Sequence, residues 1–133
     1  MIHVISFGYG HDTPPTADFT IDVRKSLRNP FHDDSLRDRN AFDRAVYEHV
    51  RKTDGARELV RGLASLVMSF EFSTGRDVTI AFGCVGGRHR SAALAMMLED
   101  ELSLNGCDTT LSHRDIFKPL LPAGTHNVKE TSA

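Results

Sequence analysis

The sequence predicts a single α/β domain with a mixed, mostly parallel sheet and flanking helices. Short apolar runs alternate along the chain with longer segments of helical periodicity, which is the pattern of strands joined by helices. A length of 133 residues and a hydrophobic content of 40% are typical of one domain with a packed core. We place this domain at residues 1–118 and expect residues 119–133, which prolines and a glycine interrupt, to form an irregular C-terminal tail.

The first two predicted strands precede a long loop. Residues 3–7 form an apolar run that is followed by glycines. Residues 19–23 alternate apolar and polar side chains, which indicates a strand with one buried face and places Asp22 and Arg24 together on the opposite face. Residues 25–39 show no periodicity and are expected to form a loop.

Two helices are expected after this loop. Apolar residues recur at helical spacing between Asn40 and Val50, which predicts a short helix. Leucines, a valine and a phenylalanine then recur every three or four residues, and Asp54 is placed to cap this second helix. The pattern predicts that the second helix stops near Gly75.

The second half of the chain contains the predicted core strand. Residues 78–82 are apolar at both alternating positions, so we expect a central strand with helices on both faces of the sheet. Residues 88–104 have helical periodicity and end at Asn105-Gly106, a favourable C-terminal stop. Residues 108–113 are predicted to be the last strand.

The segment from Gly83 to Ser91, GCVGGRHRS, connects the core strand to its helix. Successive backbone N–H groups converge there at the positive end of a helix, which is a typical anion site. Glycines allow close approach of a phosphate, and an arginine provides a forked donor. The alternative is a plain connection with solvated basic side chains. The candidate phosphate-binding residues are Asp22, Arg24, His32, Cys84, Val85, Gly86, Gly87, Arg88, His89, Arg90 and Ser91.

The same segment leaves an enzymatic alternative open. Cys84 and Arg90 have the Cys-x5-Arg spacing of tyrosine-phosphatase-like enzymes, in which a thiolate attacks phosphorus. Gly83 stands where such enzymes usually carry a histidine, and a general acid would have to come from Asp12 or Asp33. We therefore expect a non-catalytic protein, with Cys84 and Arg90 as the catalytic pair if it is an enzyme.

Composition narrows the expected partners and location. The sequence has no apolar run of membrane-spanning length and no signal peptide, so we expect a cytoplasmic protein that binds no membrane. The histidines and the two cysteines lack metal-ligand spacing, and no Walker A loop is present; we expect no metal and no cofactor. A formal net charge of −2 provides no general attraction for nucleic acids.

Five segments together resemble a known family. ISFGYG, ADFTIDVR, Asn29-Pro30, IAFGCVGGRHRS and LSHRDI occur in the order and spacing of the RapZ C-terminal domain family, over residues 2–117. The resemblance implies a mixed-sheet fold similar to a phosphofructokinase subdomain. It also implies binding of a phosphorylated amino sugar, as in enterobacterial members, and a part in small-RNA binding. The ligand positions that it implies are Asp22, Gly86 and Arg90, with Cys84 and His89 in the same loop.

The sequence also departs from this family. Val85 replaces the usual threonine, the histidine that commonly follows Asn-Pro is displaced to His32, and the tail is not basic. Full-length relatives carry a preceding P-loop kinase-like domain that this sequence lacks, so we expect no nucleotide hydrolysis. Our leading hypothesis is a regulatory module that binds a phosphorylated small metabolite, either a sugar phosphate or a nucleotide-like molecule. An RNA-binding regulator, acting as a homo-oligomer, and a phosphatase-like enzyme are the alternatives.

Overall fold

Four strands form one sheet in the computed structural model of the chain, which describes residues 1–25 and 33–122. The strand order is β2-β3-β1-β4, and every described pairing is parallel, so the predicted α/β class is confirmed. The elements in chain order are β1 (Ile2–Gly8), β2 (Phe19–Asp22), α1 (Arg44–Arg51), α2 (Ala56–Thr74), β3 (Val78–Cys84), α3 (Arg90–Leu104) and β4 (Thr109–His113).

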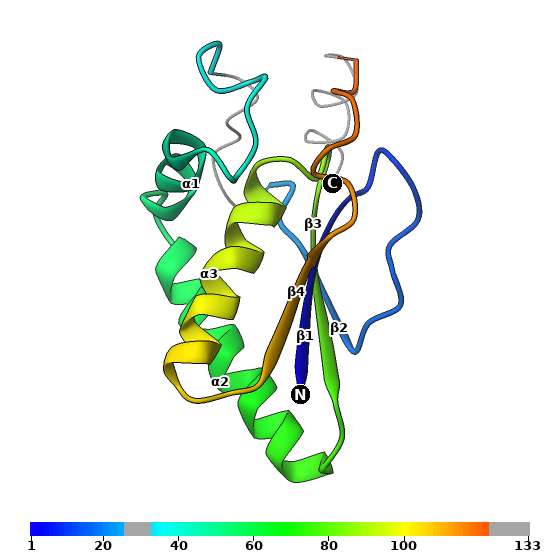
Figure 1. Cartoon of the computed structure of the whole chain (residues 1–133), viewed down its shortest axis with the longest axis vertical. Helices are drawn as coiled ribbons and strands as arrows, with labels where there is room; N and C mark the ends of the chain where they lie inside the picture. Colours follow the sequence, from blue (N-terminus) through cyan, green and yellow to red (C-terminus); the bar gives the residue numbers. More distant parts are fainter. Residues whose placement is uncertain (26–32, 123–133) are drawn as a thin grey trace.

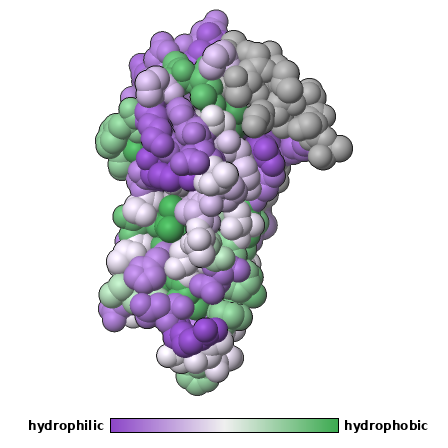
Figure 2. Space-filling view, turned by 90° about the vertical axis from the view of Figure 1, so that its right-hand side faces the viewer, coloured by the Kyte–Doolittle hydropathy of each residue, from purple (hydrophilic) through white to green (hydrophobic). Residues whose placement is uncertain are grey.

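The described helices all lie on one face of the sheet (Figure 1). α3 packs against β1, β3 and β4, while α1 and α2 pack beside it. The expectation of helices on both faces is therefore wrong. The segment that joins β1 to β2 is short and contains Pro14-Pro15, so it crosses the second face as a loop. Figure 2 shows the molecule from this loop side, where hydrophilic residues are interspersed with smaller apolar patches.

β3 is a central strand, as predicted, with β2 on one side and β1 on the other. Ile80 and Phe82 belong to the apolar core, and Ala81 between them is equally buried. Farther along the strand, the rings of Phe7 and Tyr9 pack edge to face on each other beside Gly83. A Cβ on Gly83 would come within 2.4 Å of both rings, so this position is glycine because two aromatic rings occupy the space of its side chain.

The helix boundaries follow local capping chemistry. Asp43 accepts a hydrogen bond from the Ala45 N–H at 2.9 Å, so α1 begins at Arg44 rather than near Asn40. The prediction that Asp54 caps α2 is wrong, because Gly55, with a φ of 90°, occupies the cap position without a side-chain hydrogen bond. α2 ends before Gly75 and α3 ends before Asn105, both as predicted.

Two expectations extend beyond the described part of the chain. His32 and most of the expected tail, residues 123–133, lie outside the described residues. The division into a domain of residues 1–118 and a tail therefore stays a prediction. None of the described helices is both long enough and apolar enough to cross a membrane.

Candidate functional site

The carboxyl ends of all four parallel strands meet at one edge of the sheet, which we call the carboxyl edge. The strands end there with Gly8, Asp22, Cys84 and His113. The loops after β1 and β3 are hydrogen-bonded to each other, because the Tyr9 N–H donates to the Cys84 carbonyl at 2.8 Å. Ligands of open parallel sheets bind outside the carboxyl ends of the strands, so this edge is the candidate site.

Backbone packing explains the last of the three glycines in GCVGGRHRS, Gly87. Gly87 has a φ of 75°, and a Cβ there would lie 2.8 Å from the Gly8 nitrogen. A Cβ on Gly8 would in turn lie 2.5 Å from the Gly86 carbonyl carbon. The loops after β1 and β3 therefore touch backbone to backbone, and they need glycine for that contact whether or not a ligand is present.

The Cys84 thiol lies beneath this loop and is 3% exposed. Its sulfur accepts a hydrogen bond from the Gly87 N–H at 3.3 Å and lies 3.0 Å from the Ser91 hydroxyl. These two contacts connect the end of β3 to the first turn of α3. In this structure Cys84 therefore helps to shape the loop.

Arg90 is almost completely buried, with 1% of its surface exposed. Its Nη1 donates to the Arg24 carbonyl at 2.6 Å and to the Val23 carbonyl at 3.3 Å. The guanidinium thereby fixes the chain just after β2 against the start of α3. The alternative of a solvated basic side chain is wrong for Arg90.

Arg88 and His89 contact backbone on other segments of the carboxyl edge. The Arg88 guanidinium donates to the Lys118 carbonyl at 3.0 Å and to the Asp38 carbonyl at 2.7 Å. The His89 Nε2 lies 2.8 Å from the Arg39 carbonyl and donates to it in the matching tautomer. Arg88, His89 and Arg90 are adjacent in the sequence, and together they hold three segments in place. Arg90 contacts the segment after β2, His89 and Arg88 contact the segment before α1, and Arg88 also contacts the segment after β4.

Asp22 and Arg24 lie together, as the alternating pattern predicts. Arg24 donates to both Asp22 carboxylate oxygens, and its guanidinium lies 3.9 Å from the centre of the Tyr9 ring. The hydrogen bonds from Arg24 hold the pKa of Asp22 below its ordinary value. The same hydrogen bonds raise the pKa of the Arg24 guanidinium. Both side chains are partly exposed and form a polar wall of the site.

The segment after β4 contributes residues that sequence reasoning did not assign. Asp115 is fully buried and accepts the Gly8 N–H at 2.7 Å. Arg114 and Lys118 pair with its carboxylate at 2.8 Å and 2.6 Å, and Arg114 also donates to the Gly8 carbonyl. The signal was the LSHRDI motif, which carries these charges directly after a strand but gives no indication of their partners.

His11 completes a group of basic side chains at this edge. Burial lowers its pKa, and the nearby charges of Lys118, Arg114 and Arg88 lower it further against the opposite effect of Asp115. Its Nε2 is buried and has no hydrogen-bond partner among the described residues. An imidazole whose pKa is lowered, and whose buried Nε2 has no partner among the described residues, therefore lies near three cations at the carboxyl edge.

Aromatic rings flank the site on the β4 side. Phe42 and Phe117 are 56% and 79% exposed, and their rings stack with centroids 5.8 Å apart. His113 packs edge to face on Phe42, and its Nδ1 lies 2.6 Å from the Ser6 hydroxyl. Exposed stacked rings beside a polar site are suited to the flat face of a ligand.

The Asp115 network predicts a pH dependence of stability. Burial raises the pKa of Asp115, but hydrogen bonds from Arg114, Lys118 and Gly8 together lower it to about 2 from an ordinary value of 3.8. The charged form stabilises the fold above pH 4 by about 2 kcal/mol, and this contribution is lost as the pH falls from 4 to 2. Urea denaturation across this pH range measures the effect.

A matched pair of variants isolates this contribution. Asp115→Asn should flatten the decline of unfolding free energy between pH 4 and pH 2, because the variant has no carboxylate to protonate. Asp54→Asn removes an exposed carboxylate and should keep the decline of the wild type. An unchanged profile in Asp115→Asn would contradict the assignment.

Comparisons of the sequence with known proteins identify the family of the chain. A family model described as the RapZ C-terminal domain matches residues 1–117. A nucleotide-binding protein of Fervidobacterium nodosum is 35% identical over 120 residues, which are 87% of this chain and 42% of the relative. A nucleotide-binding protein of Novosphingobium aromaticivorans is 40% identical over 119 residues, 86% of this chain and 39% of the relative.

A nucleotide-binding protein of Caldanaerobacter subterraneus is also similar, with 38% identity over 120 residues, 87% of this chain and 42% of the relative. The chain thus spans about two-fifths of the length of the curated relatives that it matches. The family match begins at the first strand and extends past Asp115, so it includes every element of the carboxyl edge. From this match, the chain belongs to the RapZ C-terminal domain family.

Proposed function

We propose that the carboxyl edge binds the phosphate group of a small phosphorylated molecule. The observation that carries this proposal is a pair of backbone N–H groups in the GCVGGRHRS loop. Within the described ranges, neither the Gly86 nor the Arg88 N–H donates a hydrogen bond, although the loop lies at the start of α3. Such N–H groups at a positive helix end are donors for phosphate oxygens.

The surrounding charges favour the same ligand. Arg88, Arg114 and Lys118 gather near the start of α3, where cations oppose the helix dipole by roughly 0.3–1 kcal/mol each. Asp115 offsets part of this positive charge, and a bound dianion would offset the remainder. The buried His11 Nε2, which has no hydrogen-bond partner among the described residues, lies close to these charges.

Neighbouring segments are suited to the rest of the ligand. The Asp22 carboxylate and the Arg24 guanidinium offer polar contacts, and the Phe42–Phe117 pair offers a flat apolar surface. A sugar phosphate and a nucleotide both present polar groups and a flat face to such a wall. The related proteins carry the name nucleotide-binding protein, which supports a phosphorylated ligand of this size.

We propose binding without turnover. The Cys84 sulfur is buried and engaged by Gly87 and Ser91, and Arg90 Nη1 is engaged by two carbonyls. A phosphatase needs an accessible thiolate and a guanidinium directed at the phosphate. The proposed ligand residues remain Asp22, Arg24, His32 and the loop from Cys84 to Ser91, with Arg90 as the residue that holds the loop in place. We add the nearby cation Lys118 as a proposed phosphate contact.

RNA is the second candidate partner of the same edge. The described cations Arg24, Arg88, Arg114 and Lys118 lie on the loops of this edge, and each could meet one backbone phosphate. Such a small number of contacts predicts weak and salt-sensitive binding by one copy of the chain. Several copies in a homo-oligomer would multiply the contacts.

The function is tested by titration with inorganic phosphate and with glucose 6-phosphate, followed by amide chemical shifts. The Gly86, Gly87 and Arg88 resonances should shift and saturate. Lys118→Gln should weaken binding at least tenfold, because one charge-assisted contact contributes about 1.5–3 kcal/mol. Arg76→Gln, a change at the opposite end of β3, should bind as the wild type does.

Three results would contradict the proposal. Shifts that avoid the loop, or equal affinity in Lys118→Gln, would mean that phosphate binds elsewhere. Turnover of an aryl phosphate that Cys84→Ser abolishes would show that the site is catalytic. A stem-loop RNA added in the same assay separates an RNA site from a small-molecule site, because only RNA binding should fall steeply with salt.

A further inference from the structure

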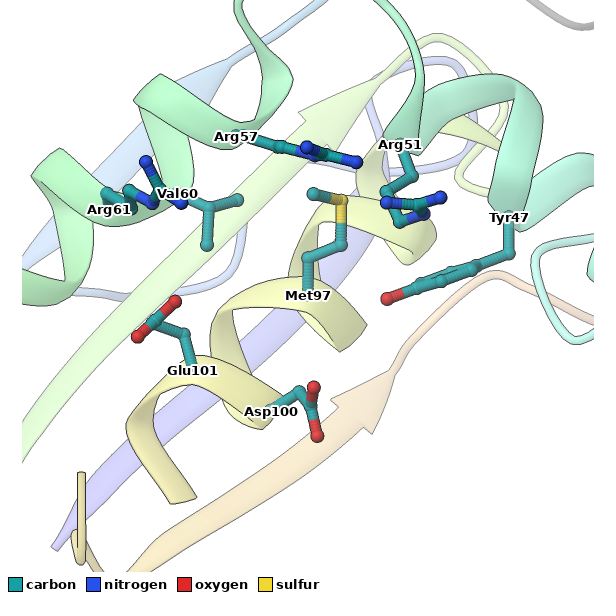
Figure 3. Close-up of a pocket in the computed structure, with 8 residues that line it drawn as sticks. All are labelled: Tyr47, Arg51, Arg57, Val60, Arg61, Met97, Asp100 and Glu101. Carbon is teal, nitrogen blue, oxygen red and sulfur yellow. The ribbon is translucent and has the colours of Figure 1, made fainter. Parts of the chain in front are cut away.

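Residues of the three described helices line a cavity that is open to solvent and shares no residue with the carboxyl edge. Its volume is about 170 Å³, and the buried side chains of Val60 and Met97 form its floor (Figure 3). Tyr47, from α1, closes one end. Pockets for drug-sized ligands measure roughly 300–1,000 Å³, so this one suits a more compact molecule.

Charged groups line the cavity in two opposing rows. Arg57 and Arg61 of α2, together with Arg51 of α1, lie along one side (Figure 3). Asp100 and Glu101 of α3 lie along the other side, across the Met97 side chain. The cavity therefore has a cationic wall and an anionic wall.

The two walls do not neutralise each other by direct contact. Arg51 pairs with Glu48 at 2.8 Å, on its own helix. In the part of the chain that the structure describes, Arg57, Arg61 and Asp100 form no ion pair. Opposite charges that face each other across a gap can each be satisfied by a ligand that carries the complementary charge at that end.

The Tyr47 hydroxyl adds a polar group between the walls. Burial raises the pKa of Tyr47, and the nearby Asp100 raises it further, so the hydroxyl is protonated at neutral pH. Asp100 and Glu101 weaken the attraction of the arginines for a free phosphate dianion, and the arginines weaken the attraction of the two carboxylates for a simple amine. The geometry selects a molecule that contains both charges.

We propose that this cavity binds a small zwitterion of the size of a free α-amino acid. Its carboxylate faces Arg57 and Arg61, and its ammonium group faces Asp100 and Glu101. Its short side chain rests on Val60 and Met97. This second site is independent of the proposed function, because phosphate would bind at the other end of α3.

The test uses L-alanine as the probe with two matched fragments. Propionate lacks the ammonium group and ethylamine lacks the carboxylate, at the same pH and ionic strength. Amide chemical shifts of residues 57–61 and 97–101 should move and saturate with L-alanine. Each fragment should bind at least tenfold more weakly than L-alanine. It carries a charge that pairs with only one wall, and it leaves the charged side chains of the opposite wall without a partner.

Variants then separate the walls. Arg61→Gln and Asp100→Asn should each weaken L-alanine binding at least tenfold, whereas Arg44→Gln, on α1 but outside the cavity, should leave it unchanged. Both substituted positions are exposed, so the fold should persist and phosphate binding at the carboxyl edge should be unaltered. No saturable shift with L-alanine, equal binding of the fragments, or unchanged affinity in both variants would overturn the proposal.

Discussion

Gly87→Ala is expected to lower the free energy of unfolding by about 3–4 kcal/mol. The new Cβ would lie 2.8 Å from the Gly8 nitrogen and 3.0 Å from the Asp115 Cβ, in a backbone conformation of positive φ. Neither neighbour can move easily, because Asp115 is buried and bonded to the Gly8 N–H. Urea denaturation monitored by circular dichroism measures the loss.

Gly106→Ala is the matched control for this prediction. Gly106 has a φ of 82°, close to that of Gly87, but no heavy atom lies within 4 Å of the position of its Cβ. The control should lose about 1–2 kcal/mol, which is the strain of positive φ alone. Equal losses at both positions would show that the contact between the two loops contributes nothing.

Arg90→Met is expected to lower the free energy of unfolding by about 2–4 kcal/mol and to weaken phosphate binding at least tenfold. Methionine fills part of the buried volume but cannot donate to the Val23 and Arg24 carbonyls. The chain after β2 would then lose its connection to α3, and the Asp22–Arg24 wall would shift. Denaturation and phosphate titration of the same variant measure the two effects.

The two measurements distinguish the roles of Arg90. An unstable variant that still binds phosphate with full affinity would make Arg90 a structural residue only. A variant as stable as the wild type would show that the hydrogen bonds from Arg90 to the Val23 and Arg24 carbonyls do not contribute to the free energy of unfolding. Arg76→Met, at an exposed position before β3, should change the free energy of unfolding by less than about 0.5 kcal/mol.

Local pattern was sufficient to predict the elements of the fold. The apolar run 78–82 indicates a central strand, and Gly75 and Asn105-Gly106 mark the ends of two helices, because these signals depend on neighbouring residues only. The same reasoning failed for the second face of the sheet. An apolar run indicates only that something covers both faces of the strand, and at Gly83 the rings of Phe7 and Tyr9 do so instead of a helix.

The candidate site was predicted in position but not in its internal contacts. GCVGGRHRS indicates an anion site because a glycine loop and a helix start are adjacent in the sequence. The partners of its side chains are distant in sequence: Arg90 contacts the chain near residue 24, and Arg88 contacts Lys118. No local periodicity encodes such pairs, so Asp115 and His11 were also missed.

The sequence by itself determined the α/β class, the order of the strands along the chain and the loop that begins α3. It did so because backbone propensity, apolar periodicity and glycine conformation act over a few residues. The tertiary structure alone decided which face the helices cover and which carbonyls the Arg88–Arg90 side chains contact. It also decided that arginines and carboxylates from three helices face each other across one cavity. These features depend on contacts between segments that are far apart in the sequence. The local sequence pattern of one segment does not indicate which distant segment it will contact.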